Sequence, residues 1–566
     1  MRNNLSRISY TVFKLAVFAI GMLSGCSKND LKSVSPYPPG PTPLVQFLDA
    51  SPQPALGAPG TNVTFMVKGL KGQESNFTFY LNQTPATVVS VGDSTVTVQI
   101  PANASSGSAS VVLNGQYYFG PIVNVKGKVG IAVGFKAFNG ATGNLSGSNL
   151  MRAYLRADGN LILVGSFSDY NHQASATDFI NGIVLVDQNG NLVSSKAPLS
   201  GLAQGLGVNG GYISSIVRLS DGQYVIGGNF SQYNIRGGMN NITMLNSDGS
   251  LDSTTVALIN SDPIHHPENN KDTIPAFNGG VINTNLLGFG LPVQALYANS
   301  NDQIIAIGNF TEYNSYYYPR STKDGRIVDR FNIGQLVRFN YDGSLDSTFN
   351  INPAAIPLIG YKGANGSISN SIQLKTGAYA GKILVTGAFT TFNGIPAPHY
   401  ALIDDEDGHV ITDFFKGSGA SDAISTVTYN VSTKKILLTG IFKSFNGAAV
   451  NGMVMLNDDG TLSTSFTFGA TQDGMANYAG QLNNGKIIVS GLFTHYNNIV
   501  RSGFMILNAD GSLAAGYNNT GTFSGYINQI VESKTDLGNN GVILIGNFVR
   551  FDNKQVNNIV KLEFQP

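Results

Sequence analysis

A short pattern that recurs seven times limits what this chain can fold into. Each copy is an apolar run followed by Gly, any residue, Phe, two further residues, an aromatic residue and Asn or Asp. The copies are LILVGSFSDYN from Leu161, YVIGGNFSQYN from Tyr224, IIAIGNFTEYN from Ile304, ILVTGAFTTFN from Ile383, ILLTGIFKSFN from Ile436, IIVSGLFTHYN from Ile487 and VILIGNFVRFDN from Val542. Internal repeats indicate one structural unit stacked on copies of itself, so they set the fold.

Each copy predicts a strand that is covered on both faces. In the first copy, Leu161 and Leu163 point to one face, and Ile162 and Val164 point to the other. A strand without a polar face belongs between packed sheets. We expect the recurring glycine, Gly165 in this copy, to remove a side chain where neighbouring backbones come close.

Asp-Gly pairs between the apolar runs predict hairpins, because Asp tolerates and Gly prefers left-handed backbone geometry. Each repeat then contains about four antiparallel strands, and the last three glycine spacings, between 51 and 55 residues, are typical of propeller blades. Gly228, Gly308 and Gly387 are instead 80 and 79 residues apart. These two units carry inserted loops, where binding surfaces usually lie.

The last repeat ends without its final strand, and the segment VGIAVGFKAFNGA from Val129 matches what is missing. We therefore predict a seven-bladed β-propeller over residues 127–566, closed by the strand near residues 129–139, with six or eight blades as the alternative. The region resembles the delta-sixty repeat propellers, through NSDGSLDST from Asn246 and NYDGSLDSTFN from Asn340. That resemblance implies a fold and no particular chemistry.

The N-terminus resembles a bacterial lipoprotein signal. Basic residues precede the apolar run LAVFAIGML from Leu15, and LSGC, ending at Cys26, follows it like a lipobox. The resemblance implies that residues 1–25 are a signal peptide and that Cys26 is lipidated, for example with palmitate, which anchors the protein in a membrane. An ordinary secretory signal is the alternative. Residues 26–43 are rich in proline and predict a stiff linker.

Residues 44–126 carry a different strand pattern. TNVTFMVKGL from Thr61, FTFYLNQTPATVVSVGDSTVTVQIP from Phe77 and GSASVVLNG from Gly107 resemble the IPT/TIG immunoglobulin-like module. Members of that family are usually spacers or protein-binding units. The predicted fold class is therefore all-β, with an immunoglobulin-like β-sandwich followed by the propeller.

Composition and motifs exclude several kinds of chemistry. Lys plus Arg equals Asp plus Glu at 34 each, so no net charge favours nucleic acid. Cys26 is the only cysteine, which excludes disulfides and thiolate metal sites. No nucleophile elbow, His-Glu-x-x-His or phosphate loop occurs. We predict no catalytic residue, cofactor or metal; His265-His266 as metal ligands and DDEDG from Asp404 as a calcium loop are the weaker alternatives.

Three functional classes remain. The leading one is a non-catalytic cell-surface lipoprotein that binds a glycan or partner protein beside an outer-membrane transporter complex. Its layout resembles the accessory glycan-binding lipoproteins of starch-utilisation-type systems, which implies an outer-membrane anchor and a domain facing the cell exterior. The second is a polysaccharide lyase or glycoside hydrolase with acidic residues converging on the central channel. The candidate acids are Asp262, Asp324, Asp329 and Asp422. The third is an adhesive or structural scaffold.

The predicted ligand-binding residues lie in one long insertion, EYNSYYYPRSTKDGR. They are Tyr313, Tyr316, Tyr317, Tyr318 and Arg320. The chain has no Trp, so tyrosine is the aromatic residue available for stacking on a sugar. The alternative is a tyrosine-rich loop that packs on its own blade.

Overall fold

The computed structural model describes residues 44–565 except residues 144–146, 176–179, 194–210, 235 and 285–289. The predicted signal peptide, Cys26 and the proline-rich linker lie outside the described residues. Residues 47–566 form one compact unit, which contains all the elements below except Gln46 at the start of β1.

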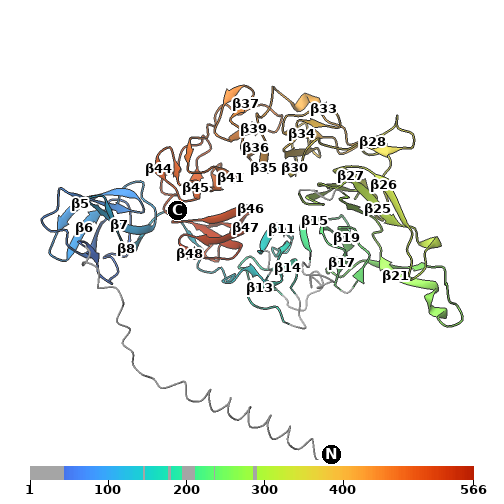
Figure 1. Cartoon of the computed structure of the whole chain (residues 1–566), viewed down its shortest axis with the longest axis horizontal. Helices are drawn as coiled ribbons and strands as arrows, with labels where there is room; N and C mark the ends of the chain where they lie inside the picture. Colours follow the sequence, from blue (N-terminus) through green and yellow to red (C-terminus); the bar gives the residue numbers. More distant parts are fainter. Residues whose placement is uncertain are drawn as a thin grey trace, which may run out of the picture. The chain divides into compact units, whose positions relative to one another are not determined.

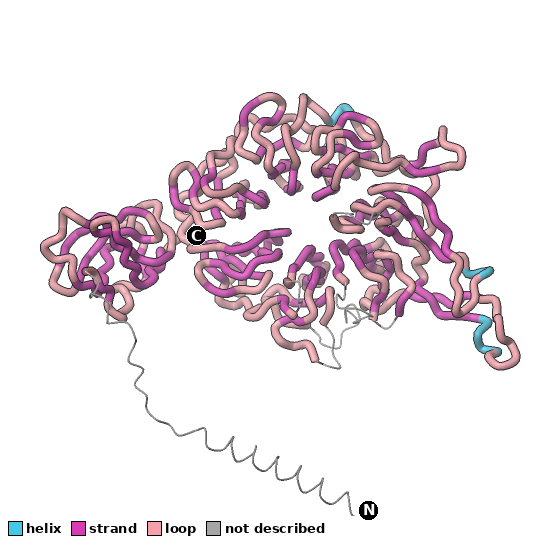
Figure 2. Tube along the Cα trace, in the orientation of Figure 1, coloured by secondary structure: helices cyan, strands magenta, loops and turns pink. Residues whose placement is uncertain are grey.

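The regular secondary structure of the described residues consists of strands joined by loops, with only three short helical turns (Figure 2), which confirms the predicted fold class. Within them the helices are three 3-10 turns, η1 (Pro267–Asn270), η2 (Tyr318–Arg320) and η3 (Thr412–Phe414). None of the described helices is long and apolar enough to cross a membrane.

The first part forms two sheets that share one strand. Its strands are β2 (Leu56–Gly57), β3 (Asn62–Lys68), β4 (Phe77–Leu81), β5 (Thr84–Val91), β6 (Thr95–Gln99), β7 (Gly107–Leu113) and β8 (Gln116–Val125). The beginning of β5 pairs with β4 and its end pairs with β6, so the strand passes from one sheet to the other. Phe65 and Phe79 pack between the sheets with ring centroids 5.0 Å apart. This is a β-sandwich core built from alternating inward residues.

From residue 129 onward, sheets of one kind repeat. Six of them have three antiparallel strands, in the order first, second, third. They are β11 (Asn149–Leu155), β12 (Leu161–Ser166) and β14 (Ile183–Val186); β15 (Tyr212–Arg218), β16 (Tyr224–Asn229) and β19 (Ile242–Leu245); β23 (Ala295–Ala298), β24 (Ile304–Ile307) and β27 (Leu336–Phe339); β30 (Ile368–Gln373), β31 (Ile383–Gly387) and β34 (Tyr400–Ile403); β35 (Ile424–Asn430), β36 (Lys435–Gly440) and β39 (Met453–Asn457); β41 (Ala476–Gln481), β42 (Ile487–Gly491) and β45 (Phe504–Leu507).

A further sheet of the same kind contains the end of the chain. It has the order β46 (Ser524–Lys534), β47 (Asn540–Phe551), β49 (Ile559–Phe564) and β9 (Val129–Ile131), and β48 (Lys554–Gln555) pairs with β47. The early strand β9 runs antiparallel to β49, with Val129 opposite Phe564. It occupies the place that the sequence left for a closing strand, although it is only three residues long.

The seven first strands meet around a centre (Figure 1). In chain order β11, β15, β23, β30, β35, β41 and β46 each pack against the next, and β46 packs against β11. We call these seven the inner strands. Such a closed circle of sheets is the predicted propeller arrangement. The division at residue 127 and the count of seven blades stay predictions, which these described sheets support.

In the six three-stranded sheets the predicted fourth strand is reduced to a single bridge. After the Asp-Gly turn the chain returns for one pairing, such as Leu245 with Leu251, and then continues to the next sheet. The side chain of Asp248 accepts a hydrogen bond from the Ser250 backbone N–H (2.9 Å), and Gly249 has φ +85°. The predicted Asp-Gly turn is therefore present, but only one residue after it pairs with the preceding strand.

The recurring glycine stands where the second strand crosses the backbone of the first. A Cβ on Gly165 would lie 2.0 Å from the carbonyl oxygen of Asn149. The six other repeat glycines face a first-strand or preceding carbonyl oxygen at 2.0 to 2.3 Å. They are Gly228, Gly308, Gly387, Gly440, Gly491 and Gly546. The predicted close backbone approach thus explains why no side chain is present.

The last two residues of the motif, the aromatic residue and the Asn, each make a hydrogen bond that stabilises a turn or loop. Tyr170, Tyr233 and Tyr496 each donate their hydroxyl to a glycine carbonyl in the turn that follows the third strand, at 2.6 to 3.0 Å. The Asn446 side-chain oxygen accepts the Gly419 backbone N–H at 2.8 Å. The motif therefore fixes the outer turn of its own sheet and the loop that arrives from the previous one.

The two long units carry extra strands. They are β20 (Ser253–Ala257), β21 (Lys271–Pro275), β22 (Gly280–Ile282), β25 (Glu312–Tyr316), β26 (Val328–Asn332), β28 (Ile351–Asn352) and β29 (Ile359–Gly360). The hairpin β20-β21 and the sheet β22-β25-β26 form an arm beside the central sheets (Figure 1). Leu258, Ile274 and Tyr318 make a small core within this arm.

The remaining strands are two-residue pieces: β1 (Gln46–Phe47), β10 (Ala141–Thr142), β13 (Asp169–Tyr170), β17 (Gln232–Tyr233), β18 (Arg236–Gly237), β32 (Thr391–Phe392), β33 (Ile395–Pro396), β37 (Ser444–Phe445), β38 (Ala448–Ala449), β40 (Thr471–Gln472), β43 (His495–Tyr496) and β44 (Ile499–Val500).

Candidate ligand pocket

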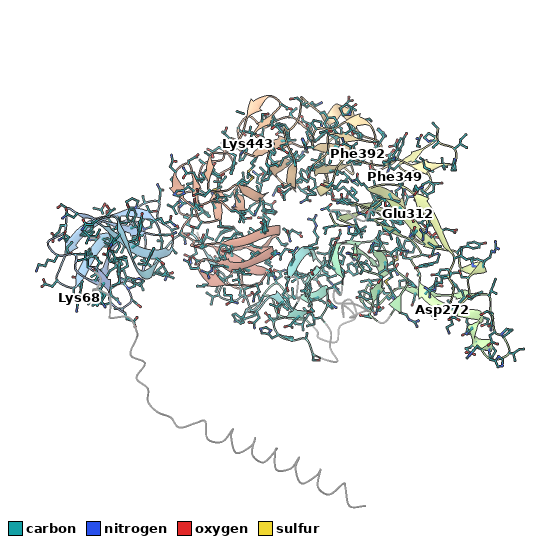
Figure 3. All side chains as sticks on the ribbon, in the orientation of Figure 1. Lys68, Asp272, Glu312, Phe349, Phe392 and Lys443 are labelled. Atoms are coloured by element: carbon teal, nitrogen blue, oxygen red, sulfur yellow. The ribbon has the colours of Figure 1, made fainter. Side chains whose placement is uncertain are left out.

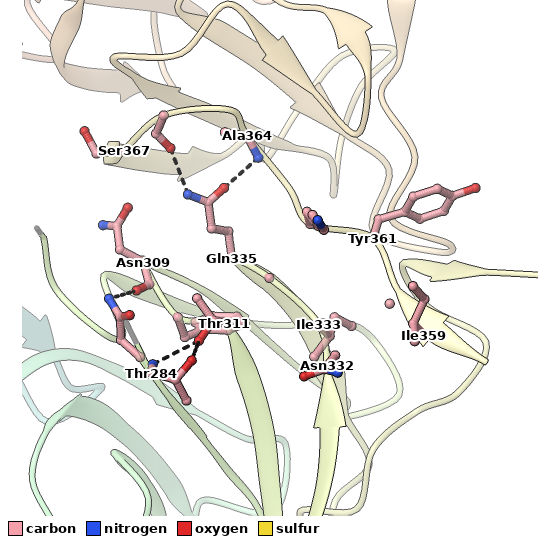
Figure 4. A pocket seen from close by; sticks show the side chains of 16 residues that line it. Thr284, Asn309, Thr311, Asn332, Ile333, Gln335, Ile359, Tyr361, Ala364 and Ser367 are labelled. Atoms are coloured by element: carbon pink, nitrogen blue, oxygen red, sulfur yellow. Dashed lines mark hydrogen bonds between the residues drawn. The ribbon is translucent and has the colours of Figure 1, made fainter. Parts of the chain in front are cut away.

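A pocket of about 1040 Å³ lies between the β23-β24-β27 sheet and the start of β30 (Figure 4). Its walls come from the ends of β22 and β26, the segment between β24 and β25, and the segment from Ile359 to Ser367. The lining residues are Asn283, Thr284, Asn309, Phe310, Thr311, Asn332, Ile333, Gly334, Gln335, Ile359, Gly360, Tyr361, Lys362, Ala364, Gly366 and Ser367. Both long units of the repeat therefore contribute to it.

Two amide side chains fix the shape of the pocket. Asn309 is buried, and its amide binds the backbone of Ile368 twice, donating to the carbonyl at 3.0 Å and accepting from the N–H at 2.9 Å. Gln335 donates to the Gly366 carbonyl at 2.8 Å and accepts the Ala364 N–H at 2.6 Å. Both residues bridge two neighbouring sheets, so the wall is rigid before any ligand binds.

The opposite wall is built from hydroxyl and amide groups. Thr284 and Thr311 share a hydrogen bond between their hydroxyls at 2.8 Å, and Asn283 donates to the Asn309 carbonyl at 2.6 Å. Residues 285–289, which follow Thr284, lie outside the described part of the chain. This wall is polar and uncharged.

The groups that remain open toward the pocket are Asn332, Ser367, Lys362 and the ring of Tyr361. The Tyr361 side chain is 36% exposed, and Figure 4 shows its ring at one end of the pocket, away from Ser367. Among the described lining residues, Lys362 is the only charged one. The same described residues include no carboxylate, so they offer no acid and base pair for hydrolysis. Amides, hydroxyls and one aromatic face instead suit the binding of an uncharged polyhydroxyl ligand.

The structure separates the five predicted arm residues. Tyr313 and Tyr318 are both 6% exposed. The Tyr313 ring packs on Phe339 at 5.8 Å and its hydroxyl donates to the Gly343 carbonyl at 3.2 Å. Burial raises the pKa of Tyr318 to about 12. These two tyrosines belong to the cores of the sheet and of the arm.

The other three predicted residues are more open. Tyr317 is 42% exposed, Arg320 is exposed, and Tyr316 is half-buried. The guanidinium that packs on the tyrosines is that of Arg326, with its carbon 5.6 Å from the Tyr316 ring centroid. Arg326 also pairs with Asp272, labelled in Figure 3, at 2.9 Å. The five residues therefore do not form one binding surface, and their role in binding stays a prediction.

The four acidic residues of the enzyme alternative are not gathered. Asp262 accepts from His265 Nδ1 at 2.9 Å within the arm, and Asp324 and Asp329 are exposed there. Asp422 is exposed before β35, in a different sheet. The inner strands contain a single acidic residue, Glu532, whose carboxylate accepts the Asn483 N–H at 2.8 Å.

In the described part, one group of three potential metal ligands occurs, at the predicted DDEDG turn. One oxygen or nitrogen atom each of Asp404, Asp407 and His409 lie within 4.8 Å of one another. Lys382 Nζ is 2.9 Å from Asp404 Oδ1 and 2.8 Å from Asp405 Oδ1. The Lys382 ammonium pairs with Asp404 and Asp405, and Asp407 shares a hydrogen bond with His409 Nδ1, so the turn carries no argument for calcium.

Sequence reasoning missed the pocket, although the repeat spacings contained a signal for its region. The long spacings on either side of Gly308 indicated where extra loops lie, and both border the pocket. Tyr313 is also the aromatic residue of the third repeat, at the position of the buried Tyr170 and Tyr233. Alignment of the repeats would therefore have removed Tyr313 from the binding residues.

Two family models match parts of the chain. Residues 22–121 match a domain of unknown function (DUF5008). Residues 219–254, 432–466 and 482–513 match a domain of unknown function (DUF5122) described as a β-propeller. The propeller match agrees with the observed sheets, whereas the resemblance to the IPT/TIG family is not confirmed. No curated protein matches the chain.

Solved structures are similar only distantly. A structural genomics protein of unknown function from Bacteroides thetaiotaomicron shares 12% identity over 93% of this chain and 99% of its own, with a TM-score of 0.24. An auxiliary nutrient binding protein from Bacteroides ovatus shares 13% over 69% and 94%, with a TM-score of 0.21. The Cps50 (Swd1) β-propeller domain of Myceliophteria thermophila shares 11% over 75% and 99%, with a TM-score of 0.34. At these scores the likeness carries no argument about function.

Proposed function

We propose that this protein is a non-catalytic binding protein whose pocket between the β23-β24-β27 sheet and β30 holds an uncharged saccharide. The observation that carries the proposal is the described lining, in which amides and hydroxyls occur with one exposed tyrosine at the end of the pocket and without a carboxylate. The interlocked Asn309 and Gln335 side chains support it, because a wall that is already ordered binds at a lower entropy cost.

The same proposal places the protein on a membrane surface beside a nutrient-uptake complex. Support comes from the lipobox-like sequence at Cys26 and from the linker and sandwich that follow it. A lipid-anchored binding protein needs a pocket and a tether but no catalytic machinery, which agrees with a described lining that holds no carboxylate. The outer membrane and the cell exterior are part of this proposal.

The proposal is tested with a glycan array and calorimetry on a soluble protein that begins after Cys26. We expect binding of at least one neutral oligosaccharide. Tyr361→Ala should weaken that binding about tenfold, because it removes a stacking face worth roughly 1.4 kcal/mol. Asn332→Ala should weaken it less, by the loss of one hydrogen bond.

Tyr317→Ala is the matched control, since it removes an exposed tyrosine from the arm. Unchanged affinity in that variant is the expected result. Loss of binding with Tyr317→Ala and not with Tyr361→Ala would move the site to the arm. Failure of every glycan to bind would refute the saccharide and favour a protein ligand.

A further inference from the structure

The segment that joins the sandwich to the propeller region packs against a loop of the propeller. It runs from Val125, the last residue of β8, to Val129, the first residue of β9. The loop lies between β45 and β46 and contains Asn519. A Cβ on Gly127, in the middle of the segment, would lie 2.3 Å from the side-chain oxygen of Asn519. The segment and the loop are therefore in direct contact.

The amide of Asn519 binds both ends of this segment. Its nitrogen donates to the Val125 carbonyl at 3.2 Å and to the Val129 carbonyl at 3.0 Å. Its oxygen accepts the Val129 N–H at 3.4 Å. Strand β9 pairs with β49 over three residues, so an anchor on both backbone groups of its first residue strengthens a short pairing.

The sandwich in turn fixes the backbone of Asn519. The N–H and the hydroxyl of Ser106 both donate to the Asn519 carbonyl, at 2.9 and 3.0 Å. The same hydroxyl accepts the Val125 N–H at 2.9 Å. Ser106 and Val125 are both 3% exposed. These three residues therefore form a closed hydrogen-bond network that is largely shielded from water, where hydrogen bonds are stronger than at the surface.

Two further contacts attach the same part of the sandwich to the last two sheets of the propeller region. It is the 103–106 loop, between β6 and β7. Arg501, before β45, is 4% exposed, and its guanidinium donates to the Asn103 carbonyl at 3.1 Å. Asn553, in the turn between β47 and β48, donates from its side chain to the Ser106 carbonyl at 3.2 Å. The loop is thus bound to both sheets.

The propeller side of this junction is fixed to its own sheet. Asn518 is buried, and its side chain accepts the Ile506 N–H at 2.9 Å and donates to the Ile506 carbonyl at 2.8 Å. The loop is therefore attached to β45 one residue before Asn519. Asn519 gives the sandwich and β9 a common anchor point on the propeller.

A docked sandwich also limits how far β9 can move. Val125 lies four residues before Val129, so a fixed Val125 keeps the start of β9 within about 13 Å of its place even when β9 is unpaired. A strand tethered this closely pairs again at a high effective concentration. A sandwich that was free to move would carry β9 away from β49.

We propose that the sandwich has a further function as a clasp of the propeller, which holds the closing strand β9 against β49 by docking the 103–106 loop on the last two sheets. The sandwich is then a working part of the propeller and not only a spacer between the linker and the sheets. This role does not depend on what the pocket binds.

The first test needs no substitution. Hydrogen exchange of the soluble protein that begins after Cys26 is followed by mass spectrometry at increasing urea concentrations. We expect peptides that contain residues 103–106 and residues 129–131 to lose protection in the same step, because Asn519 holds both. Protection of β9 that persists after the 103–106 loop has opened would overturn the proposal.

The second test cuts the junction without changing β9 or Asn519. Ser106→Ala removes the two hydroxyl bonds, and Arg501→Met removes the bond to the Asn103 carbonyl. In the double variant we expect the β9 amides to exchange at least tenfold faster, roughly the effect of losing two or three hydrogen bonds. Each single variant should show part of this increase.

Two reference variants set the scale. Ala132→Pro removes a bond from the end of β9 to Lys561 on β49 and shows the exchange of a released strand. Thr64→Val removes a hydroxyl bond to Thr97 between β3 and β6 and is the matched control, which should leave β9 protected.

Thermal melting accompanies each variant. Faster exchange that is confined to the 103–106 loop and the loop around Asn519, with β9 still protected in a normally melting double variant, would overturn the proposal. The sandwich would then be docked on the propeller without holding its closing strand. If the double variant melts early, the exchange of the unmodified protein decides.

Discussion

A single side chain shows how strictly the repeat motif is used. In six copies the last motif position is Asn, and Asn446 illustrates its role by accepting a backbone N–H from the incoming loop. The seventh copy has Asp552 instead, and its Oδ1 accepts the Gly521 N–H at 2.8 Å. Burial raises the pKa of Asp552, against the opposing effects of Gly521 and Lys554.

We predict that Asp552→Asn stabilises the protein at pH 7 by about 1 kcal/mol, since the acceptor is retained and a partly buried charge is removed. The folded carboxyl has the higher pKa, so the folded state binds more protons and its stability falls as pH rises from the unfolded value near 3.8 through the raised pKa. Urea unfolding at pH 3.5 and pH 7 measures the difference. Asp458→Asn, in the turn that follows β39, is the control.

Sequence alone could assign several single-residue roles. The function of the repeat glycines follows from their recurrence, and the structure supplies the carbonyl oxygen that each one avoids. The partner of the motif tyrosine could not be predicted, because the accepting turn glycine is 15 to 20 residues away in Tyr170, Tyr233 and Tyr496. Such contacts depend on the length of the third strand, which sets the position of the turn that follows it.

Strand β9 joins the start of the propeller region to its last sheet with only three residues. It brings only Val129 to Ile131 against β49, and the Ala132 N–H then donates to the Lys561 carbonyl at 2.9 Å. Lys561 itself is buried, and its ammonium donates to the Gln188 and Lys534 carbonyls at 3.0 and 2.7 Å. These contacts connect the sheet at the chain end to the sheet that begins with β11.

We predict that Ala132→Pro destabilises the protein by about 1 to 3 kcal/mol, because proline removes the donor to Lys561 and leaves a buried carbonyl unpaired. Val133→Pro is the matched control, since Val133 is 89% exposed and lies in the following turn. Chemical denaturation of both variants gives the comparison. Equal stability of the two would show that β9 contributes nothing to ring closure.

The sequence predicted the strands better than their lengths. The apolar runs and the Asp-Gly pairs place the second and third strands well, because both are local features of the sequence. The fourth strand fails as a prediction, since a bridge such as Leu456 with Leu462 has the same apolar sequence as a longer strand would. Its length depends on where the next sheet begins.

For the protein as a whole, the pocket is the feature that sequence could least foresee. Its walls span residues 283 to 367 and meet only after two sheets have packed. No residue type in the lining is unusual. Of the tyrosines that stand out in the insertion, Tyr313 and Tyr318 are buried in hydrophobic cores. The inserted lengths indicated the region, but the side chains that line it follow from packing.

Anchoring is tested on the intact precursor. We predict that Cys26→Ser releases the protein from membranes into the soluble fraction, because one acylated cysteine is the proposed tether. Cell fractionation and protease treatment of whole cells measure release and surface exposure. Ser27→Ala, beside the proposed lipobox cysteine, is the control and should remain membrane-bound.

The pairing of β9 with β49 also fixes the order of events during biosynthesis. Val129 leaves the ribosome 435 residues before its partner Phe564. Every intermediate chain therefore carries an unpaired strand until the final stretch has been synthesised, and closing such a large loop is slow. A chain that stops before Ile559 lacks β49, so β9 has no partner there and its free edge is open to pairing with other chains.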